Sequence, residues 1–223
     1  MVESPEHKAN NNLSSKLSLF VKRIFDLIAG LLVFILCLPF LFVFAILIKL
    51  DSKGPALFIQ KRLGRNGKVF NCYKFRTMVR DAEEALRLSL EKDPSLQKEW
   101  DANYKLKKDP RITRVGRFLR KTSLDELPQM INVIQGKMSL VGPRPRPLYE
   151  LEGRREDELF HIGLALRPGI TGLWQVSGRN ELDFEHRIRL DAAYVRNRSL
   201  WLDIALLFRT ISIVLWQKGA YLV

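Results

Sequence analysis

One long apolar run constrains this 223-residue chain more than any other feature. Residues 27–48 carry no charged side chain, and a straight helix of that length would reach about 33 Å, enough to cross the hydrocarbon core of a bilayer. A cleaved signal peptide is disfavoured, because the run is long and residues 51–54 offer no small-residue cleavage site. The run is therefore typical of a membrane element.

Two features favour a helix that enters the membrane and returns to the same face. Pro39 lies inside the run, where it removes a hydrogen-bond donor and clashes with the preceding turn, so we expect a membrane break there. Basic residues flank both ends of the run, so the cytoplasmic preference of Lys and Arg selects no direction for a spanning helix. We predict a re-entrant hairpin over residues 22–50, with an ordinary spanning anchor as the alternative.

The rest of the chain mixes short strand patterns with helical ones. Residues 56–60 and 69–76 alternate as strands around Asn66-Gly67, which is a hairpin signal. Helical patterns cover residues 81–90, 97–106, 150–166 and 184–196. Residues 199–217 are apolar with tryptophan near both ends, which suits an amphipathic helix at the bilayer interface or a buried core helix. These patterns predict a helix-rich, mixed α/β domain.

The charge and the cysteines narrow the chemistry. A formal net charge of +13 predicts an anionic partner, either nucleic acid, lipid headgroups or a phosphorylated substrate. Cys37 lies inside the apolar run and neither it nor Cys72 belongs to a CxxC pair, which argues against a disulfide framework or a thiolate zinc site. The three histidines lack metal-ligand spacing.

A pair of adjacent carboxylates, Asp125 and Glu126, is the first candidate for catalysis. Two cations precede them, at what reads as the start of a helix. A purely structural interpretation is also available, because Ser123 and Glu126 have the spacing of a capping box. Pro128 weakens that interpretation, since proline fits best in the first turn and moves the expected helix start toward residue 127.

Arginines in stiff or turning loops are the second candidate group. Glycine and proline hold residues 139–147 extended, so Arg144 and Arg146 project from a stiff loop and could bind phosphate bidentately, or could simply be solvated. Residues 167–180, which include Arg179, would wrap a nucleotide or turn a corner. Period-two geometry places Lys74 and Arg76 on one face of the second strand.

Taken in order, these segments resemble the bacterial sugar transferases, also called polyprenyl-phosphate hexose-1-phosphate transferases or monotopic phosphoglycosyl transferases. The resemblance covers residues 22–221 and rests on the motifs KRIFD (22–26), GPALFIQKRLG (54–64), YKFRTM (73–78), TSLDELPQ (122–129), SLVGPRP (139–145) and RPGITGLWQVSGRN (167–180). Some relatives have serine before the membrane proline, where this chain has Leu38. The larger relatives also carry N-terminal spanning helices, so this chain resembles a minimal catalytic version or a piece of a longer one.

The resemblance implies a fold and a division of the chain. It implies a mobile N-terminal tail (1–21), a re-entrant membrane helix hairpin (22–50), a cytosolic α/β catalytic domain (51–198) and a C-terminal interfacial amphipathic helix (199–223). It also implies the bacterial inner membrane, with the catalytic domain facing the cytoplasm.

The implied reaction transfers a hexose 1-phosphate from a UDP-sugar, of galactose or glucose type, to undecaprenyl phosphate. This would be the first membrane step of exopolysaccharide or lipopolysaccharide O-antigen assembly. By resemblance, Asp125 is the nucleophile that forms a covalent phosphosugar and also a ligand of Mg²⁺, with Glu126 assisting proton transfer or metal positioning. Candidates for substrate binding are Lys74, Arg76, Arg120, Arg144, Arg146, Arg179 and Asp191.

Two alternatives stay open. A membrane-tethered, non-enzymatic module could use the basic surface to bind anionic lipid or nucleic acid, but it gives no reason for paired carboxylates between two phosphate-binding loops. Direct transfer within a ternary complex would keep the enzyme and leave Asp125 as a metal ligand only. With the enzyme interpretation we expect no nucleic-acid partner, and homo-oligomer formation is left open.

Overall fold

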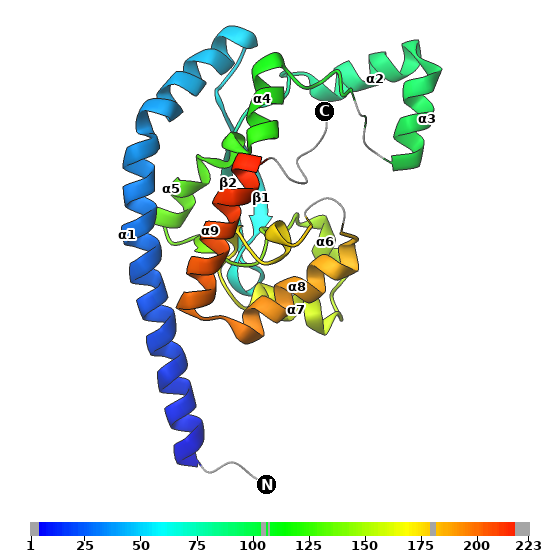
Figure 1. Ribbon diagram of the computed structural model, residues 1–223. Coiled ribbons are helices and arrows are strands. Elements are labelled where there is room, and N and C mark those ends of the chain that lie inside the picture. Colours follow the sequence, from blue (N-terminus) through cyan, green and yellow to red (C-terminus); the bar gives the residue numbers. More distant parts are fainter. Residues whose placement is uncertain (1–4, 104–105, 107, 179–181, 217–223) are drawn as a thin grey trace.

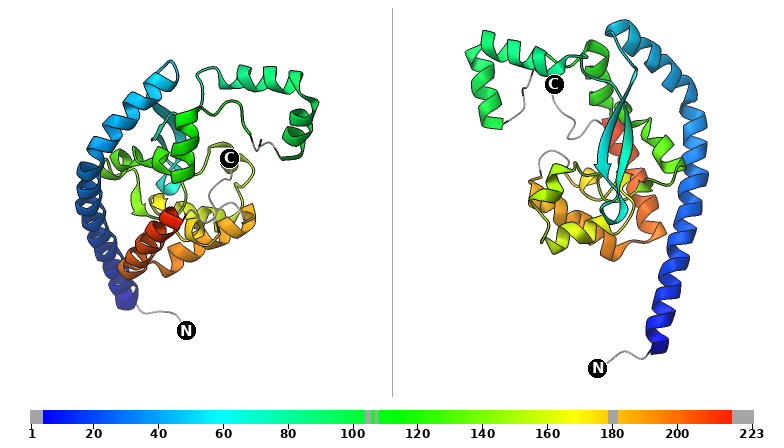
Figure 2. Two further views of the ribbon diagram at one scale, coloured as in Figure 1. Left: turned by 45° about the horizontal axis from the view of Figure 1, so that its top comes forward. Right: turned by 180° about the vertical axis from the view of Figure 1, so that it is seen from behind.

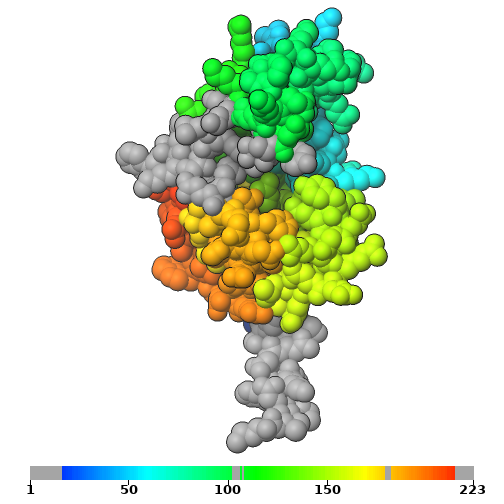
Figure 3. Space-filling model, turned by 90° about the vertical axis from the view of Figure 1, so that its right-hand side faces the viewer, coloured from blue at the N-terminus to red at the C-terminus, as the bar shows by residue number. Residues whose placement is uncertain are grey.

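The computed structural model describes residues 5–103, 106, 108–178 and 182–216 (Figure 1). A long helix, α1 (Pro5–Asp51), lies along one side of the molecule. Two helices, α2 (Ala82–Lys92) and α3 (Pro94–Asn103), form an arm that projects from the body at the other side. In Figure 3 this arm forms the top of the face that is turned to the viewer, and residues 149–178 and 182–197 form the bottom of that face. The helix-rich, mixed α/β architecture predicted above is confirmed.

Helix α1 extends beyond the predicted membrane element of residues 22–50. It begins at Pro5, so the polar residues assigned to a tail continue the helix. Proline suits the first helical position, where its missing N–H would have had no partner. The helix also stays continuous through Pro39 and curves over toward the body near its C-terminal end, rather than folding back as a hairpin (Figures 1 and 2). One missing donor bends a helix without ending it. Re-entry into the membrane stays a prediction.

One side of α1 packs on the body and the other is exposed. Gly30 permits the close approach, because a Cβ atom there would lie 3.1 Å from Val133 Cγ1. The segment Leu17–Asp51 is the one candidate membrane span among the described residues, and only 6% of its most apolar window is buried. Its exposed large side chains include Leu27, Ile28, Leu31, Leu32, Ile35, Leu36, Phe40 and Phe42. Such a surface suits contact with lipid.

The predicted β-hairpin is confirmed. Strand β1 (Leu57–Leu63) pairs antiparallel with β2 (Val69–Phe75), and Phe58 lies opposite Lys74. The connecting turn, η1 (Arg65–Gly67), has Asn66 at φ 56° and Gly67 at φ 74°, the left-handed values that these two residues tolerate best.

A second, parallel strand pair was not predicted. Strand β3 (Ser139–Val141) pairs with β4 (Gly169–Thr171) inside the body. Around it lie α4 (Arg114–Thr122), η2 (Leu124–Glu126), α5 (Gln129–Ile134), α6 (Tyr149–Glu152), α7 (Glu158–Leu164), η3 (Trp174–Val176) and α8 (Phe184–Asn197). The helix expected over 150–166 is therefore two shorter helices. Its break spans Gly153, a weak helix former, and ends at Asp157, whose side chain caps α7.

Helix α9 (Leu200–Trp216) combines the two alternatives offered by its sequence. Leu206 is buried in the main core, with Val141, Val176 and other apolar side chains. Trp201, Phe208 and Ile211 point outward and are 79%, 70% and 56% exposed. The helix thus has a core face and an apolar outer face, and its location at a bilayer interface stays a prediction.

Candidate active site

The two adjacent carboxylates lie in a tight turn between two helices. Ser123 ends α4 in the left-handed conformation at φ 58°, and its N–H donates back to Arg120 and Leu119 carbonyls. The turn η2 then carries Asp125 and Glu126. The capping-box interpretation is wrong, because Ser123 closes the preceding helix and its side chain caps nothing in the turn. A non-glycine residue held at positive φ is typical of strained, functional turns.

Lys74 meets this turn from the end of the hairpin. Its Nζ donates to Glu126 Oε1 at 2.6 Å, and both side chains are partly exposed. Burial alone would raise the pKa of Glu126, but the charge and hydrogen bond of Lys74, with the charges of Arg144 and Arg62, bring it below its ordinary value. Glu126 is therefore held as a carboxylate.

Asp125 behaves in the opposite way. Burial, followed by the negative charge of Glu126, raises the pKa of Asp125 to about 6, although Lys74 and Arg120 partly offset the shift. Two neighbouring carboxylates with pKa values pushed apart are typical of sites that divide two chemical roles.

A basic cavity opens beside the acidic pair. Its lining residues are Arg62, Lys74, Glu126, Gln129, Arg144, Pro145, Ile170, Trp174 and Gln175. Trp174 lies between two guanidinium groups, since the Cζ atoms of Arg144 and Arg187 each lie 5.1 Å from its ring centre. The cavity thus combines cations, one carboxylate and an aromatic wall.

Three polar atoms lining this cavity are buried without a partner among the described residues. They are Arg62 Nη1, Trp174 Nε1 and Gln175 Oε1. Buried polar atoms are nearly always hydrogen-bonded, and each exception calls for an explanation. The side chains that carry these two donors and one acceptor all line the same cavity, which favours a polar ligand there.

The sequence analysis missed Arg62, Trp174 and Gln175. Arg62 had a usable signal, because period-two alternation and hairpin pairing place Phe58, Gln60 and Arg62 on the same face as Lys74. Trp174 and Gln175 lie in η3, within the segment 167–180 that is predicted either to surround a nucleotide or to form a turn.

The structure places Arg76 outside the cavity. Its Nη2 donates to Ser52 O at 2.7 Å and to Ser52 Oγ at 3.0 Å, at the C-terminal end of α1. Carbonyls at a helix end need such donors. Arg76 is thus engaged at the end of α1, and its predicted role in substrate binding stays a prediction.

Arg146 and Asp191 also do not line the cavity. Arg146 Nη2 lies 2.6 Å from Asp191 Oδ2, and the two side chains are 5% and 1% exposed. The Arg146 guanidinium also lies over the rings of Phe160 and Phe184. The alternative interpretation of Asp191 as a helix-surface carboxylate is wrong, because its side chain is buried, and substrate binding by Arg146 and Asp191 stays a prediction. Burial raises the pKa of Asp191 to about 7, although the charge and the hydrogen bond of Arg146 partly offset the shift.

The remaining predicted residues divide as follows. Arg120 donates through Nε to Thr77 Oγ1 at 2.8 Å, and its charge acts on Asp125. Arg144 and Lys74 line the cavity. Arg179 lies outside the described residues. Among the residues that the structure describes, no group of three or more metal-binding side chains occurs, and the predicted role of Asp125 as a metal ligand stays a prediction.

Comparison with known proteins then identifies the family. Residues 17–217 match the family described as Bacterial sugar transferase. The chain belongs to this family. It is 49% identical to the undecaprenyl-phosphate galactose phosphotransferase of Salmonella typhimurium over 96% of its own length and 44% of that protein.

Other relatives differ in length. An uncharacterized sugar transferase of Haemophilus influenzae is 51% identical over 95% of this chain and 44% of that protein. The exopolysaccharide production protein ExoY of Rhizobium meliloti is 43% identical over 90% of this chain and 88% of its own length. The chain thus spans less than half of the first two relatives and most of the third.

Proposed function

We propose that this chain catalyses transfer of a hexose 1-phosphate from a UDP-sugar to undecaprenyl phosphate, at the cytoplasmic face of the bacterial inner membrane. The names of its relatives support this class of reaction. They include the Salmonella galactose phosphotransferase, a UDP-galactose-lipid carrier transferase of Erwinia amylovora and an undecaprenyl-phosphate glucose phosphotransferase of Komagataeibacter xylinus. The galactose and glucose in these names support a donor of either type, and the name of the exopolysaccharide production protein ExoY supports a step in exopolysaccharide assembly. We place this chain at the first membrane step of exopolysaccharide or O-antigen assembly.

One structural observation carries the proposal. The acidic pair Asp125 and Glu126 adjoins a basic cavity in which buried Arg62, Trp174 and Gln175 atoms lack partners. A nucleoside diphosphate sugar offers phosphate oxygens to the cations, together with hydroxyl or base groups for the remaining donor and acceptor. The apolar exposed side of α1 provides the route to a lipid acceptor.

In the first step, an ionised Asp125 oxygen attacks the β-phosphorus of the donor. A new O–P bond forms, the bond to the bridging oxygen breaks, and UMP leaves with that electron pair. A pKa of about 6 leaves Asp125 mostly ionised at neutral pH and avoids an unreactive, strongly stabilised carboxylate. Lys74, Arg62 and Arg144 lie where they can balance the developing phosphate charge.

In the second step, an oxygen of polyprenyl phosphate attacks the phosphorus of the acyl phosphate. The lipid-linked sugar diphosphate forms and the Asp125 carboxylate is regenerated, so covalent catalysis divides one displacement into two. Glu126 is kept ionised by Lys74, which favours a role in positioning a cation over one in proton transfer.

The carboxylates of Asp125 and Glu126 match the usual ligands of Mg²⁺ in proteins. Mg²⁺ takes one or two protein carboxylates and completes its shell with water and substrate phosphates. Asp125 and Glu126 are adjacent and supply that number. When bound, the ion would neutralise charge on the donor diphosphate.

The deciding experiment is release of UMP from a panel of UDP-sugars. The chain is reconstituted in lipid with undecaprenyl phosphate and Mg²⁺, and we expect UMP with a galactose- or glucose-type donor. Absence of UMP with every donor would overturn the enzyme and leave the non-enzymatic lipid- or nucleic-acid-binding module. Capture of labelled phosphosugar on the protein, without acceptor, separates covalent transfer from direct transfer in a ternary complex.

A further inference from the structure

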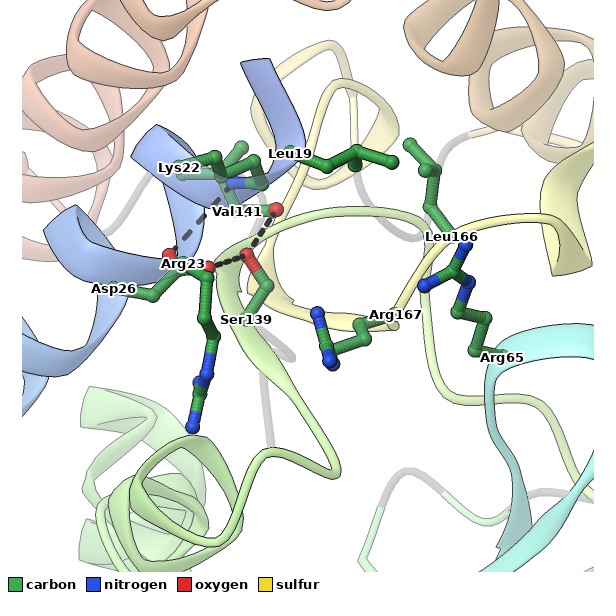
Figure 4. Close-up of a pocket in the computed structure, with 9 residues that line it drawn as sticks. All are labelled: Leu19, Lys22, Arg23, Asp26, Arg65, Ser139, Val141, Leu166 and Arg167. Atoms are coloured by element: carbon green, nitrogen blue, oxygen red, sulfur yellow. Dashed lines mark hydrogen bonds and ion pairs between the residues drawn. The ribbon is translucent and has the colours of Figure 1, made fainter. Parts of the chain in front are cut away.

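A second basic cavity lies at the opposite end of the hairpin from Lys74. Figure 4 shows it bounded by α1, by β3, by the hairpin turn that carries Arg65, and by the segment before β4 that carries Arg167. Five residue steps along the hairpin separate the pair Leu63–Val69 from the pair Phe58–Lys74, which is about 17 Å in an antiparallel strand. This cavity is therefore distinct from the one beside Asp125.

The cations of this cavity outnumber its acidic groups. Its lining includes Lys22, Arg23, Arg65 and Arg167 but a single carboxylate, Asp26. That carboxylate is already engaged, because Ser139 Oγ donates to Asp26 Oδ2 at 2.8 Å and the Leu140 N–H donates to Oδ1 at 3.1 Å. Lys22 is paired with Asp203 at 2.6 Å. Three arginines thus share a cavity without an acidic partner of their own among the described residues.

Two of these arginines have hydrogen-bond donors that are not used by the described residues. Arg65 and Arg167 each use Nε for a carbonyl, Ala165 O at 3.2 Å and Gly136 O at 2.8 Å. Their terminal nitrogens have no partner among the residues that the structure describes. Arg23, by contrast, donates both terminal nitrogens to carbonyls at the end of α5. Burial, followed by the positive charges of Arg23 and Arg65, lowers the pKa of Arg167.

The position of the cavity along α1 indicates the source of an anion that could pair with these arginines. Leu19 to Asp26 line the cavity, and the uncharged run begins with the next residue, Leu27. If that run enters hydrocarbon, the cavity lies at headgroup depth, whether α1 re-enters or spans. Phe20 of α1 and Trp201 of α9 are 63% and 79% exposed, as aromatic side chains at a bilayer interface are. The ion pair of Lys22 with Asp203 ties these two helices together.

We propose that this cavity binds the phosphodiester headgroup of an anionic bilayer lipid, separately from the donor and the acceptor. A phosphodiester supplies the acidic oxygens that the arginines lack, and its acyl chains continue along the exposed apolar side of α1. The bound lipid fixes the depth of the domain at the membrane. The inference rests on the membrane location within the proposed function, but not on its chemistry.

The test measures lipid binding by the full chain in a non-ionic detergent, by native mass spectrometry. Phosphatidylglycerol is the probe and phosphatidylcholine the zwitterionic comparison. We expect one retained phosphatidylglycerol, and a loss of affinity of about 30-fold in the double variant Arg65→Gln/Arg167→Gln. Arg189→Gln, an exposed arginine of α8 away from the cavity, is the matched control and should bind as the wild type does.

Two results would overturn the proposal. If the double variant binds phosphatidylglycerol as tightly as the control does, the cavity is not the site. If inorganic phosphate at equal concentration displaces the lipid, the site takes a free anion rather than a headgroup. Arg65→Gln alone, at an exposed turn, serves if the double variant fails to fold, and should weaken binding about fivefold. Because binding is read without turnover, failure here leaves the proposed reaction untouched.

Discussion

Two ion pairs in this protein have the same length and different consequences. Lys74 to Glu126 and Arg146 to Asp191 both measure 2.6 Å. In the first pair the side chains are 19% and 34% exposed, whereas in the second they are 5% and 1% exposed. The first borders a cavity with unpartnered donors, and the second is enclosed by aromatic rings.

The difference shows how charged motif residues divide between chemistry and framework. A buried pair holds elements together and is costly to break, because one charge is left without water or partner. A partly exposed pair contributes little to stability and leaves its charges to act on neighbours.

The largest effect is expected for Asp125→Asn. Loss of the nucleophile should reduce UMP release by about 10⁴-fold or more. The thermal unfolding midpoint should not fall, because an ionised carboxylate buried beside Glu126 costs stability at neutral pH. Asp183→Asn, an exposed residue before α8, is the activity control. Substantial turnover in Asp125→Asn would exclude Asp125 as the nucleophile and leave it a role as metal ligand only.

The framework pair is tested by Asp191→Ala. It leaves Arg146 buried without its main partner, and we expect a loss of about 3–5 kcal/mol in the free energy of unfolding. Denaturant titration in detergent measures it. Glu185 lies on the same helix as Asp191 and forms an exposed ion pair with Arg154. Glu185→Ala breaks that pair and should cost less than about 1 kcal/mol. Equal losses in both variants would contradict the division between the two kinds of pair.

Arg62→Gln sharpens the same contrast between two buried arginines. Arg62 lines the cavity and its buried Nη1 has no partner among the described residues, whereas Arg146 pairs with Glu150 and Asp191. We expect the KM for the UDP-sugar to rise about 10- to 100-fold, the value of a charge-assisted hydrogen bond, with little change in unfolding. Arg189→Gln controls for charge. A drop in stability without a change in KM would make Arg62 a framework residue.

How far the sequence predicts the molecule depends on how local each interaction is. Asn66 and Gly67 fix the hairpin turn through their own backbone preferences, so that element was predictable. The contacts of Arg76 depend on the carbonyl and hydroxyl oxygens of Ser52, and those of Arg146 on a carboxylate 45 residues away. Neither partner can be read from the neighbouring sequence.

The same reasoning explains the candidate site. Lys74, Asp125, Glu126 and Arg144 were predicted because their motifs have a chemical pattern. The parallel pairing of β3 with β4 has no local signal, because parallel strands are joined through a long connection. The cavity beside that sheet, with the unpartnered atoms of Trp174 and Gln175, therefore became visible only in three dimensions.

The smallest expected effect comes from Lys74→Met, and it concerns the pH dependence of the rate. Lys74 lowers the pKa of Asp125, so its removal should raise that pKa above about 6. Asp125 must be ionised to attack, so the acid limb of the rate profile should move to higher pH. Stability should change by about 1 kcal/mol or less, because the pair with Glu126 is partly exposed.

Initial rates of UMP release between pH 5 and 9, each normalised to its own plateau, separate this shift from a general loss of phosphate binding. Lys61→Met, an exposed lysine on the partner strand β1, keeps the charge change and leaves the acidic pair untouched. Its acid limb should coincide with that of the wild type. An unmoved limb in Lys74→Met, with a large loss of stability instead, would place Lys74 with Arg146 as framework, and the contrast between the two ion pairs would then disappear.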